Sequence, residues 1–288
     1  MQNAVTEPSE TTNLQSGLYV VATPIGNLGD MVPRAVQVLQ SVDLIAAEDT
    51  RHSAPLLKHF SIKTPTMSYH DHSNEAAIQR IDRVIRGGGA VALISDAGTP
   101  LISDPGYKLL RAAHLQQWRV VPVPGASAVI AALSVAGLPT DRFRFEGFLP
   151  AKAAARRTAL ADLAQETVTL VFYEAPHRVA EALEDMAAAF GGDRPAVLAR
   201  ELTKTFETVI QLPLDALRQF VAADDNQARG EIVIVVSGAI RQDAALSAEV
   251  RKLLDSLSEH LPPRRAAALV SDACGVRKKQ LYDYLISR

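Results

Sequence analysis

Charged side chains that could transfer protons gather at three places where a short apolar run ends. The groups are Glu48, Asp49 and Arg51 after VDLIAA, Glu174, His177 and Arg178 after VTLVFY, and Arg200, Glu201 and Lys204 at the end of PAVLAR. Carboxylates and cations held close together are typical of general acid–base catalysis. Structural ion pairs would leave the same pattern in a sequence, so these residues are candidates for either role.

A ligand site is indicated by the stretch SDAGTPLISDPG, residues Ser95–Gly106, which directly follows the apolar run AVALI. Gly98 allows close approach to the backbone, and Pro100 and Pro105 stiffen the loop. A stiff loop presents N–H and C=O groups to a polar small molecule at low entropic cost. The turn VPGAS adds the Ser127 hydroxyl at the start of a helix, where serine also commonly acts as a cap. We expect a ligand with amino-acid and nucleoside parts; a plain connecting loop is the alternative.

Motifs for several other chemistries are absent. The sequence has no GxSxG for a nucleophilic serine, no GxGxxG after a strand and no Walker A motif. These absences argue against serine hydrolysis, nicotinamide chemistry and nucleoside-triphosphate chemistry. His70, Asp71 and His72 could bind a cation, but neither CxxC nor HExxH accompanies them. We therefore expect no metal.

Short apolar runs alternate with longer helical patterns in the first half of the chain. Strands are expected at 18–22, 42–47, 90–95 and 119–123, with helices such as 33–40 and 74–86 between them. Strands that are apolar throughout and interleaved with helices predict a parallel sheet covered on both faces. Ligands of such sheets bind beyond the carboxyl ends of the strands, where the loops described above begin.

The second half predicts a mixed sheet and then helices. Strands are expected at 168–173, 195–200, 207–212 and 230–238, a helix at 178–190, and final helices at 247–259, 262–273 and 276–286. The second and third of these strands are too close for a helical crossover, so they must pair as a hairpin. The predicted fold class is α/β: two α/β domains, one with a parallel and one with a mixed sheet, plus a small C-terminal helical segment.

The last segment is basic. We place the domain limits at 1–16 for a polar, disordered tail, 17–142 and 143–240 for the two α/β domains, and 241–288 for the helical appendage. From His260 to Arg288 six Lys or Arg oppose two Asp, whereas the whole chain carries a net charge of −2. A helix–turn–helix with basic residues suits contact with a nucleic-acid backbone. The residues predicted to contact RNA are Arg264, Arg265, Arg277, Lys278 and Lys279. A cap that only packs on a domain is the alternative.

Composition sets broad limits on the class of protein. Hydrophobic residues make up 48% and charged residues 22%, which is typical of a folded chain. The single cysteine, Cys274, excludes an intramolecular disulfide and fits a reducing compartment. The start of the sequence does not resemble a secretion signal, and no apolar run reaches the roughly 18 residues of a membrane span. We expect a cytoplasmic protein.

Eight motifs make the chain similar to the tetrapyrrole methylase superfamily. In chain order they are LYVVATPIGNLGD, AAEDTRHS, SDAGTPLISDPG, VPGASAVIAAL, FRFEGFLP, FYEAPHRV, RELTKTFE and GEIVIVVSG, between residues 18 and 238. The resemblance implies two α/β domains that bind S-adenosylmethionine between them. The superfamily's usual GDP loop reads Gly98-Thr99-Pro100 here, as is typical of its RNA-modifying branch. Within that branch, the chain most resembles an enzyme that methylates a ribose 2′-hydroxyl of a cytidine in 16S rRNA of the small ribosomal subunit, so the resemblance implies this activity. The resemblance also implies a homodimer.

The resemblance further implies which residues hold the cofactor. They are Pro24, Ile25, Gly98, Thr99, Pro100, Ile102, Ser127 and Ala128 from the first domain, and Phe172, Tyr173, Gly230, Glu231 and Ile232 from the second. A ribose 2′-hydroxyl is a poor acid, so a base or a cation that lowers its pKa would help. Glu48, Asp49 and Arg51 are the foremost catalytic candidates. The competing functions are a corrinoid or porphyrin methylase, which has no need of basic helices, and a non-catalytic RNA-binding module that keeps the pocket.

Overall fold

The first half of the chain forms a parallel sheet. The computed structural model describes residues 14–70, 75–240 and 246–287, so the start of the polar tail and the possible cation ligands Asp71 and His72 lie outside the described residues. The strand order is β3 (Thr66–Ser68), β2 (Leu44–Ala47), β4 (Ala90–Ile94), β1 (Gly17–Val21) and β5 (Val120–Val123), and every neighbouring pair is parallel. Strands β2 and β4 are buried along their whole length, which explains their uninterrupted apolar sequence.

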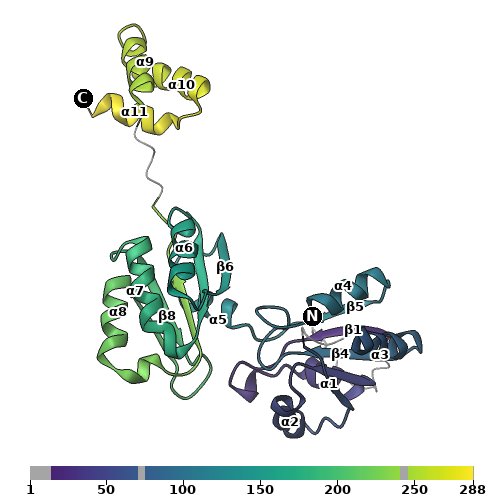
Figure 1. Ribbon diagram of the computed structural model, residues 1–288. Helices are drawn as coiled ribbons and strands as arrows, with labels where there is room; N and C mark the ends of the chain where they lie inside the picture. The colour runs from purple at the N-terminus through teal and green to yellow at the C-terminus, as the bar shows by residue number, and fades with distance from the viewer. Residues whose placement is uncertain (1–13, 71–74, 241–245, 288) are drawn as a thin grey trace, which may run out of the picture. The chain divides into compact units, whose positions relative to one another are not determined.

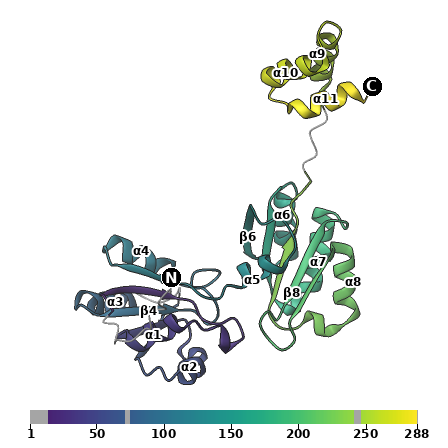
Figure 2. The ribbon, with the colours of Figure 1, turned by 180° about the vertical axis from the view of Figure 1, so that it is seen from behind.

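Helices cover both faces of this sheet, as Figures 1 and 2 show from opposite sides. Helices α1 (Pro33–Ser41) and α2 (Thr50–His59) pack on one face, and α3 (Glu75–Arg86) and α4 (Tyr107–Leu115) pack on the other. Each helix presents an apolar stripe, such as Ile81 and Ile85 of α3, which lie one turn apart. The predicted doubly covered parallel sheet is confirmed.

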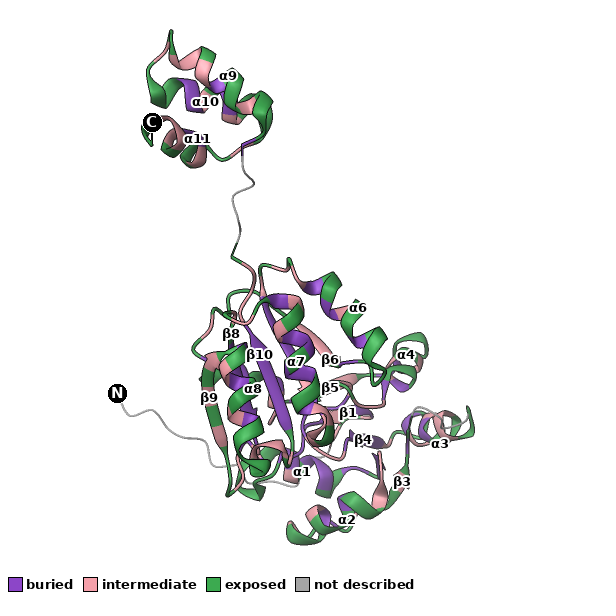
Figure 3. Cartoon of the chain, turned by 60° about the vertical axis from the view of Figure 1, so that its left-hand side comes forward, coloured by how far each residue is buried: buried purple, intermediate pink, exposed green. Residues whose placement is uncertain are grey.

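The second half forms a mixed sheet. Its strand order is β6 (Phe143–Phe148), β7 (Thr169–Glu174), β10 (Ile232–Val236), β8 (Pro195–Arg200) and β9 (Thr208–Pro213). Only the β6–β7 pair is parallel, and β8 and β9 form the predicted antiparallel hairpin. Figure 3 shows β8 and β10 as buried strands behind α7 and α8.

The two faces of the mixed sheet are covered by helices of different origin. Helices α6 (Ala153–Leu163), α7 (Val179–Phe190) and α8 (Leu214–Ala223) pack on one face. The other face packs against α5 (Ala128–Val135), which follows β5 of the parallel sheet. Ile25, from the loop after β1, joins the same apolar cluster. Segments of the first half therefore lie against the second sheet, and a site between the two can draw on both.

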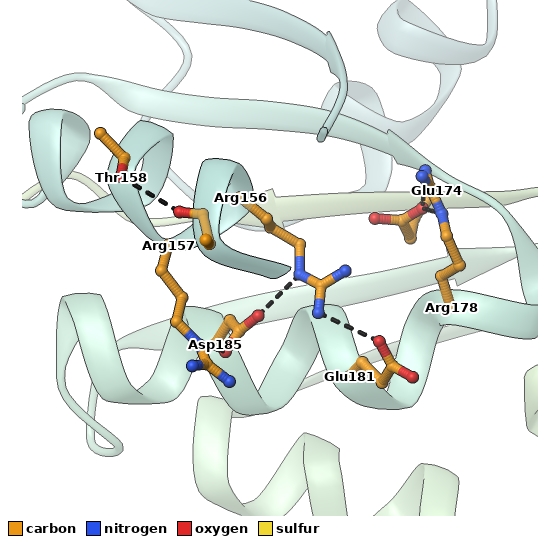
Figure 4. A network of polar contacts seen from close by, with 8 residues as sticks. Arg156, Arg157, Thr158, Glu174, Arg178, Glu181 and Asp185 are labelled. Atoms are coloured by element: carbon orange, nitrogen blue, oxygen red, sulfur yellow. Dashed lines mark hydrogen bonds and ion pairs between the residues drawn. The ribbon is translucent and has the colours of Figure 1, made fainter. Parts of the chain in front are cut away.

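A buried ion cluster joins α6 to α7 (Figure 4). Arg156 is 2% exposed, and its Nε donates to Asp185 Oδ2 at 2.7 Å while its Nη2 donates to Glu181 Oε2 at 3.1 Å. Arg157, on the solvent side, donates from Nε to the other oxygen of Asp185 at 2.8 Å. A buried guanidinium requires such partners, because an unpaired charge in this position would be strongly destabilising.

The C-terminal residues form a separate compact unit. The chain divides into Met1–Ala239 and Ile240–Arg288. Within the described residues the second unit contains α9 (Ala248–Ser258), α10 (Pro263–Cys274) and α11 (Lys278–Ile286), as predicted. Leu254, Val270 and Leu281 are fully buried in its own core, and Gly275, at a φ of +68°, ends α10. The limits set at 142 and 143 for two α/β domains stay a prediction. In the described part of the chain, no helix is both long enough and apolar enough to span a membrane.

The chain also contains short 3-10 turns. They are η1 (Leu28–Asp30), η2 (Pro176–Arg178) and η3 (Asp225–Ala228).

Candidate cofactor-binding site

A cavity of about 360 Å³ lies where the carboxyl ends of the parallel strands meet the mixed sheet. The first half lines it with Ile25, Ala97, Gly98, Thr99, Ile102, Ser103, Asp104, Ser127 and Ala128. The second half lines it with Phe148, Tyr173, Glu174, Ala175, Pro176, Ala199, Leu202, Gly230, Glu231, Ile232 and Val233. The loops after β1, β4 and β5 all contribute, which is the position expected of a ligand site in an open parallel sheet.

Hydrogen bonds join these three loops to one another. Thr23 and Gly98 exchange two backbone bonds, at 2.8 and 3.1 Å, and so link the loops after β1 and β4. The Thr99 hydroxyl donates to the Ala126 carbonyl at 2.9 Å and links the loop after β4 to the start of α5. These hydrogen bonds therefore tie the three loops of the cavity wall to one another.

The loop after β4 has an unusual backbone. Gly98 has a φ of +79°, and Leu101 and Ser103 also lie in the left-handed region, at φ values of 74° and 66°. Residues other than glycine rarely adopt this backbone conformation, and those that are held in it cluster at ligand sites. A Cβ added at Gly98 would lie 3.2 Å from Ile25 Cγ2. The glycine therefore leaves the backbone of this loop open to a ligand.

Aromatic side chains form part of the wall on the mixed-sheet side. The Tyr173 ring packs edge-on against Phe145 and Phe148, at 4.9 and 5.6 Å between ring centroids. Burial raises the pKa of Tyr173 to about 12, so its hydroxyl stays protonated at neutral pH. Phe148 lines the cavity and is also exposed to solvent, which places this ring at the mouth.

Most residues that the family resemblance selected for the cofactor line the cavity. Pro24, Pro100 and Phe172 are not among its lining residues. Phe172 is fully buried on the opposite face of β7, where its ring stacks on Phe190 of α7 at 6.5 Å. Neighbouring strand residues point to opposite faces, so Tyr173 faces the cavity and Phe172 does not.

The structure adds lining residues that the sequence did not single out. Asp104 and Ser103 belong to the stiff loop itself, and Phe148 belongs to the motif FRFEGFLP. The signal that could have found Asp104 is its place in a Gly- and Pro-rich loop after a parallel strand. Leu202 and Val233 belong to the motifs RELTKTFE and GEIVIVVSG, but neither residue was among those predicted to hold the cofactor.

The candidate catalytic residues Glu48, Asp49 and Arg51 lie beside the cavity loop but do not line the cavity. Asp49 caps α2 by accepting from the Arg51 N–H at 2.8 Å, and its carboxylate pairs with the Arg51 guanidinium at 2.9 Å. Hydrogen bonds from Arg51 lower the pKa of Asp49 to about 2, so this carboxylate is a weak proton acceptor. Glu48 Oε2 accepts from the Asp96 N–H at 3.3 Å. The catalytic role of this group stays a prediction.

The other two charged groups form internal ion pairs. Arg178 Nη2 lies 2.6 Å from Glu174 Oε1, and His177 beside it is exposed. Lys204 Nζ lies 2.8 Å from Glu201 Oε1 and 3.0 Å from Glu231 Oε2. Both groups therefore form the structural ion pairs that the sequence offered as the alternative to a catalytic role.

Arg200 also makes structural contacts. It is buried, and its Nη2 donates to the Phe206 carbonyl at 2.9 Å across the β8–β9 hairpin.

The predicted RNA-contacting residues all lie on the C-terminal unit. They are Arg264, Arg265, Arg277, Lys278 and Lys279, and all are exposed. Arg264 lies over the ring of Tyr282 at 5.9 Å, and Lys278 and Lys279 open α11. Whether they contact RNA stays a prediction.

The chain belongs to the tetrapyrrole (corrin/porphyrin) methylases, whose family model matches residues 17–218. A second family model, described as the RsmI C-terminal HTH domain, matches residues 244–288. Curated relatives that match are named ribosomal RNA small subunit methyltransferase I. The protein of that name from Pseudomonas aeruginosa is 56% identical over 94% of this chain and 97% of its own. The one from Escherichia coli O157:H7 is 49% identical over 96% of each chain. The chain thus belongs to a family of methyltransferases.

Solved structures with the same fold include other methyltransferases. Uroporphyrin-III-C-methyltransferase from Thermus thermophilus has a TM-score of 0.55 at 19% identity, covering 77% of this chain and 94% of that one. Cobalt precorrin-4 methyltransferase has a TM-score of 0.58 at 16% identity, covering 80% and 97%. At this level of identity the likeness concerns the fold alone.

Proposed function

We propose that the protein is a cytoplasmic enzyme that transfers a methyl group from S-adenosylmethionine to the ribose 2′-hydroxyl of a cytidine in 16S rRNA of the small ribosomal subunit. The observation that carries the proposal is a cavity at the strand ends, lined by the family motifs, in a chain that matches ribosomal RNA small subunit methyltransferases over almost its whole length. The methylase fold alone would fit several substrates, so the class of acceptor rests on the curated relatives.

The residues of the cavity fit S-adenosylmethionine. A volume of about 360 Å³ with a mainly apolar lining and few polar groups is typical of a small-molecule site. Ser127 stands at the N-cap of α5, but its side chain makes no capping hydrogen bond. The hydroxyl is therefore available to a ligand, as is the open backbone at Gly98. Ile25 and Ile102 offer apolar contacts from the same wall.

The task of the protein is then mainly one of position. When bound, S-adenosylmethionine supplies a methyl group activated by a sulfonium. The linked loops at Thr23, Gly98 and Thr99 hold the backbone contacts in place, and holding two reactants in line removes much of the entropic barrier. Leu202 and Val233 give the cavity an apolar wall, which would limit the number of water molecules around a bound ligand. No metal is part of the proposal.

The C-terminal unit would hold the RNA. Its exposed basic side chains at the start of α10 and α11 can contact phosphates without reading sequence. Its separate hydrophobic core means that it can keep its fold while it binds.

The proposal includes a homodimer. Exposed apolar side chains on the first unit, among them Tyr107, Ile130 and Val135, are of the kind that a second copy would cover. Light scattering on the purified full chain tests this part: a mass of twice 31.0 kDa supports the dimer, and a mass of 31.0 kDa contradicts it.

The product identifies the reaction. Small subunits that lack the modification are incubated with the protein and labelled S-adenosylmethionine, and the rRNA is digested to nucleosides. We expect the label in 2′-O-methylcytidine. Label on a base, or label on another ribose, would contradict the proposed reaction while leaving a methyltransferase in place.

A further inference from the structure

Three carboxylate residues line the cavity in the described part of the chain: Asp104, Glu174 and Glu231. Glu174 is paired with Arg178, and Glu231 is paired with Lys204. Asp104 has no salt-bridge partner among the described residues, so its charge, unlike that of the other two, is not balanced by a neighbouring cation.

Acidic and hydroxyl groups surround Asp104. Ser95, at the end of β4, forms a hydrogen bond with its carboxylate, and the like charges of Glu48 and Asp96 face it. Tyr173 of β7 lines the same cavity, and its hydroxyl stays neutral because burial raises its pKa. Burial, with smaller contributions from Glu48 and Asp96, raises the pKa of Asp104 to about 6, against the lowering effect of Ser95. Asp104 is thus a stronger base than an ordinary aspartate and is still ionised at neutral pH.

The loop holds Asp104 in a fixed place. Leu101 and Ser103 have positive φ values just before it, and Gly106, at 139°, follows it. A Cβ on Gly106 would lie 3.1 Å from Leu93 Cδ2 of β4, and a Cβ on Gly147 of β6 would lie 3.3 Å from Ser103 Oγ. The segment is therefore packed between its own strand and β6, and a strained segment held this firmly is typical of a functional site.

We propose that Asp104 is the general base of the reaction and receives the proton of the acceptor hydroxyl, an inference that rests on the proposed ribose methylation. The ribose oxygen forms its new bond to the methyl carbon as the bond from that carbon to sulfur breaks, and the electron pair of the broken bond stays on sulfur. The hydroxyl proton passes to the Asp104 carboxylate. The step ends with a methyl ether, a neutral thioether and a protonated Asp104.

The main test compares Asp104→Asn and Asp104→Glu with the wild type on small subunits. Loss of a general base costs on the order of 10² to 10⁴-fold in turnover. We expect a loss in this range for the asparagine variant, partial recovery in the glutamate variant, and S-adenosylmethionine affinity by calorimetry within about two-fold of wild type. Turnover of the asparagine variant within about three-fold of wild type would overturn the role.

The pH profile gives a second readout. Wild-type turnover should rise with pH and level off above an apparent pKa of about 6, the value raised by burial. The variant Asp96→Asn removes a neighbouring like charge, so it should move this limb to lower pH and, because Asp104 becomes a weaker base, lower the plateau by less than Asp104→Asn does. A profile that stays unchanged in Asp104→Asn would contradict the proposal.

A direct titration needs no turnover. In protein labelled with ¹³C at the aspartate carboxyl, one resonance should titrate near a pKa of about 6 and be missing from Asp104→Asn. A normal aspartate pKa for that resonance would overturn the inference. Absence of methyl transfer by the wild type to any RNA would instead refute the proposed function, and the role of Asp104 with it.

Discussion

Thr23 and Gly98 exchange two backbone hydrogen bonds, one in each direction, between the loops that follow β1 and β4. This short antiparallel bridge ties together loops from two neighbouring parallel strands at the edge where ligands bind. It also fixes the left-handed backbone of Gly98, whose φ is +79°. The position of the cavity wall therefore depends on a residue without a side chain.

A side chain at Gly98 should abolish cofactor binding. The indole of Gly98→Trp would meet Ile25 and fill the cavity, so calorimetry should detect no S-adenosylmethionine binding. Gly88→Ala is the matched control, because Gly88 also has a positive φ, +89°, and an added Cβ there meets nothing within 4 Å. Unchanged affinity in Gly98→Trp would refute this placement of the cofactor. Lost affinity after chelation would refute binding without a metal.

Charge removal beside the cavity should lower turnover more than cofactor affinity. Glu48 faces Asp104 and adds to its raised pKa, so Glu48→Gln should make that carboxylate a weaker base. Arg51→Ala removes an exposed cation that pairs with Asp49. We expect turnover to fall several-fold in each variant, measured beside the affinity by calorimetry. Near wild-type turnover in both would exclude a catalytic role there, and a matching loss of stability would favour the ion-pair alternative.

The buried ion cluster of Figure 4 should be a stability determinant. Asp185→Asn leaves the buried Arg156 with a weaker acceptor, and the free energy of unfolding should fall by about 3 kcal/mol in urea titrations. Arg157→Ala, which removes the exposed partner of the same carboxylate, should cost much less. Equal losses of unfolding free energy in the two variants would show that the burial of Arg156 does not determine how much stability Asp185→Asn loses.

The difference in free energy of unfolding between wild type and Asp185→Asn should depend on pH in a defined direction. Burial alone would raise the pKa of Asp185, but hydrogen bonds from Arg157 and Arg156 prevail and lower it. A lowered pKa contributes stability above the unfolded value, about 3.8, and the contribution is lost as pH falls through the folded value. The gap between wild type and Asp185→Asn should therefore narrow below pH 4. A gap that widens in acid would contradict the assignment.

The basic C-terminal unit should act through phosphates. Replacing Arg277, Lys278 and Lys279 together by alanine should weaken RNA binding and spare cofactor binding. The slope of log affinity against log salt should flatten by roughly 0.7 to 0.9 for each phosphate that the variant no longer neutralises. A packing role predicts a lower melting temperature and an unchanged slope. An unchanged slope with the fold intact would end the RNA role of these residues.

Patterns along the chain predicted the two sheets but missed one edge strand of each, β3 and β6, whose exposed and half-buried residues do not form an apolar run. Apolar runs such as AVALI predicted β4 of a parallel sheet, and the short gap between 195–200 and 207–212 predicted the β8–β9 hairpin. These features are local, so periodicity and spacing contain them. The packing of α5 against the second sheet depends on tertiary contacts, so no local sequence pattern could predict it.

The site was predicted less completely, for physical reasons. Motifs located the Gly98 loop. They could not tell that Tyr173 lines the cavity and Phe172 does not, because this depends on which face of the sheet each strand residue points to. Charge patterns selected Asp49 and Arg51. In the structure, Asp49 caps α2 and the two side chains form an ion pair with each other. Asp104 stands out only once the partners of the other lining carboxylates are known.

The central claim, that this methyltransferase acts on ribosomal RNA, is tested most directly by offering several acceptors side by side. The full chain is incubated with labelled S-adenosylmethionine and, separately, whole small ribosomal subunits, naked 16S rRNA and uroporphyrinogen. We predict that label enters the RNA of small subunits or free rRNA and that uroporphyrinogen stays unlabelled. Label in uroporphyrinogen and none in either RNA sample would contradict the account.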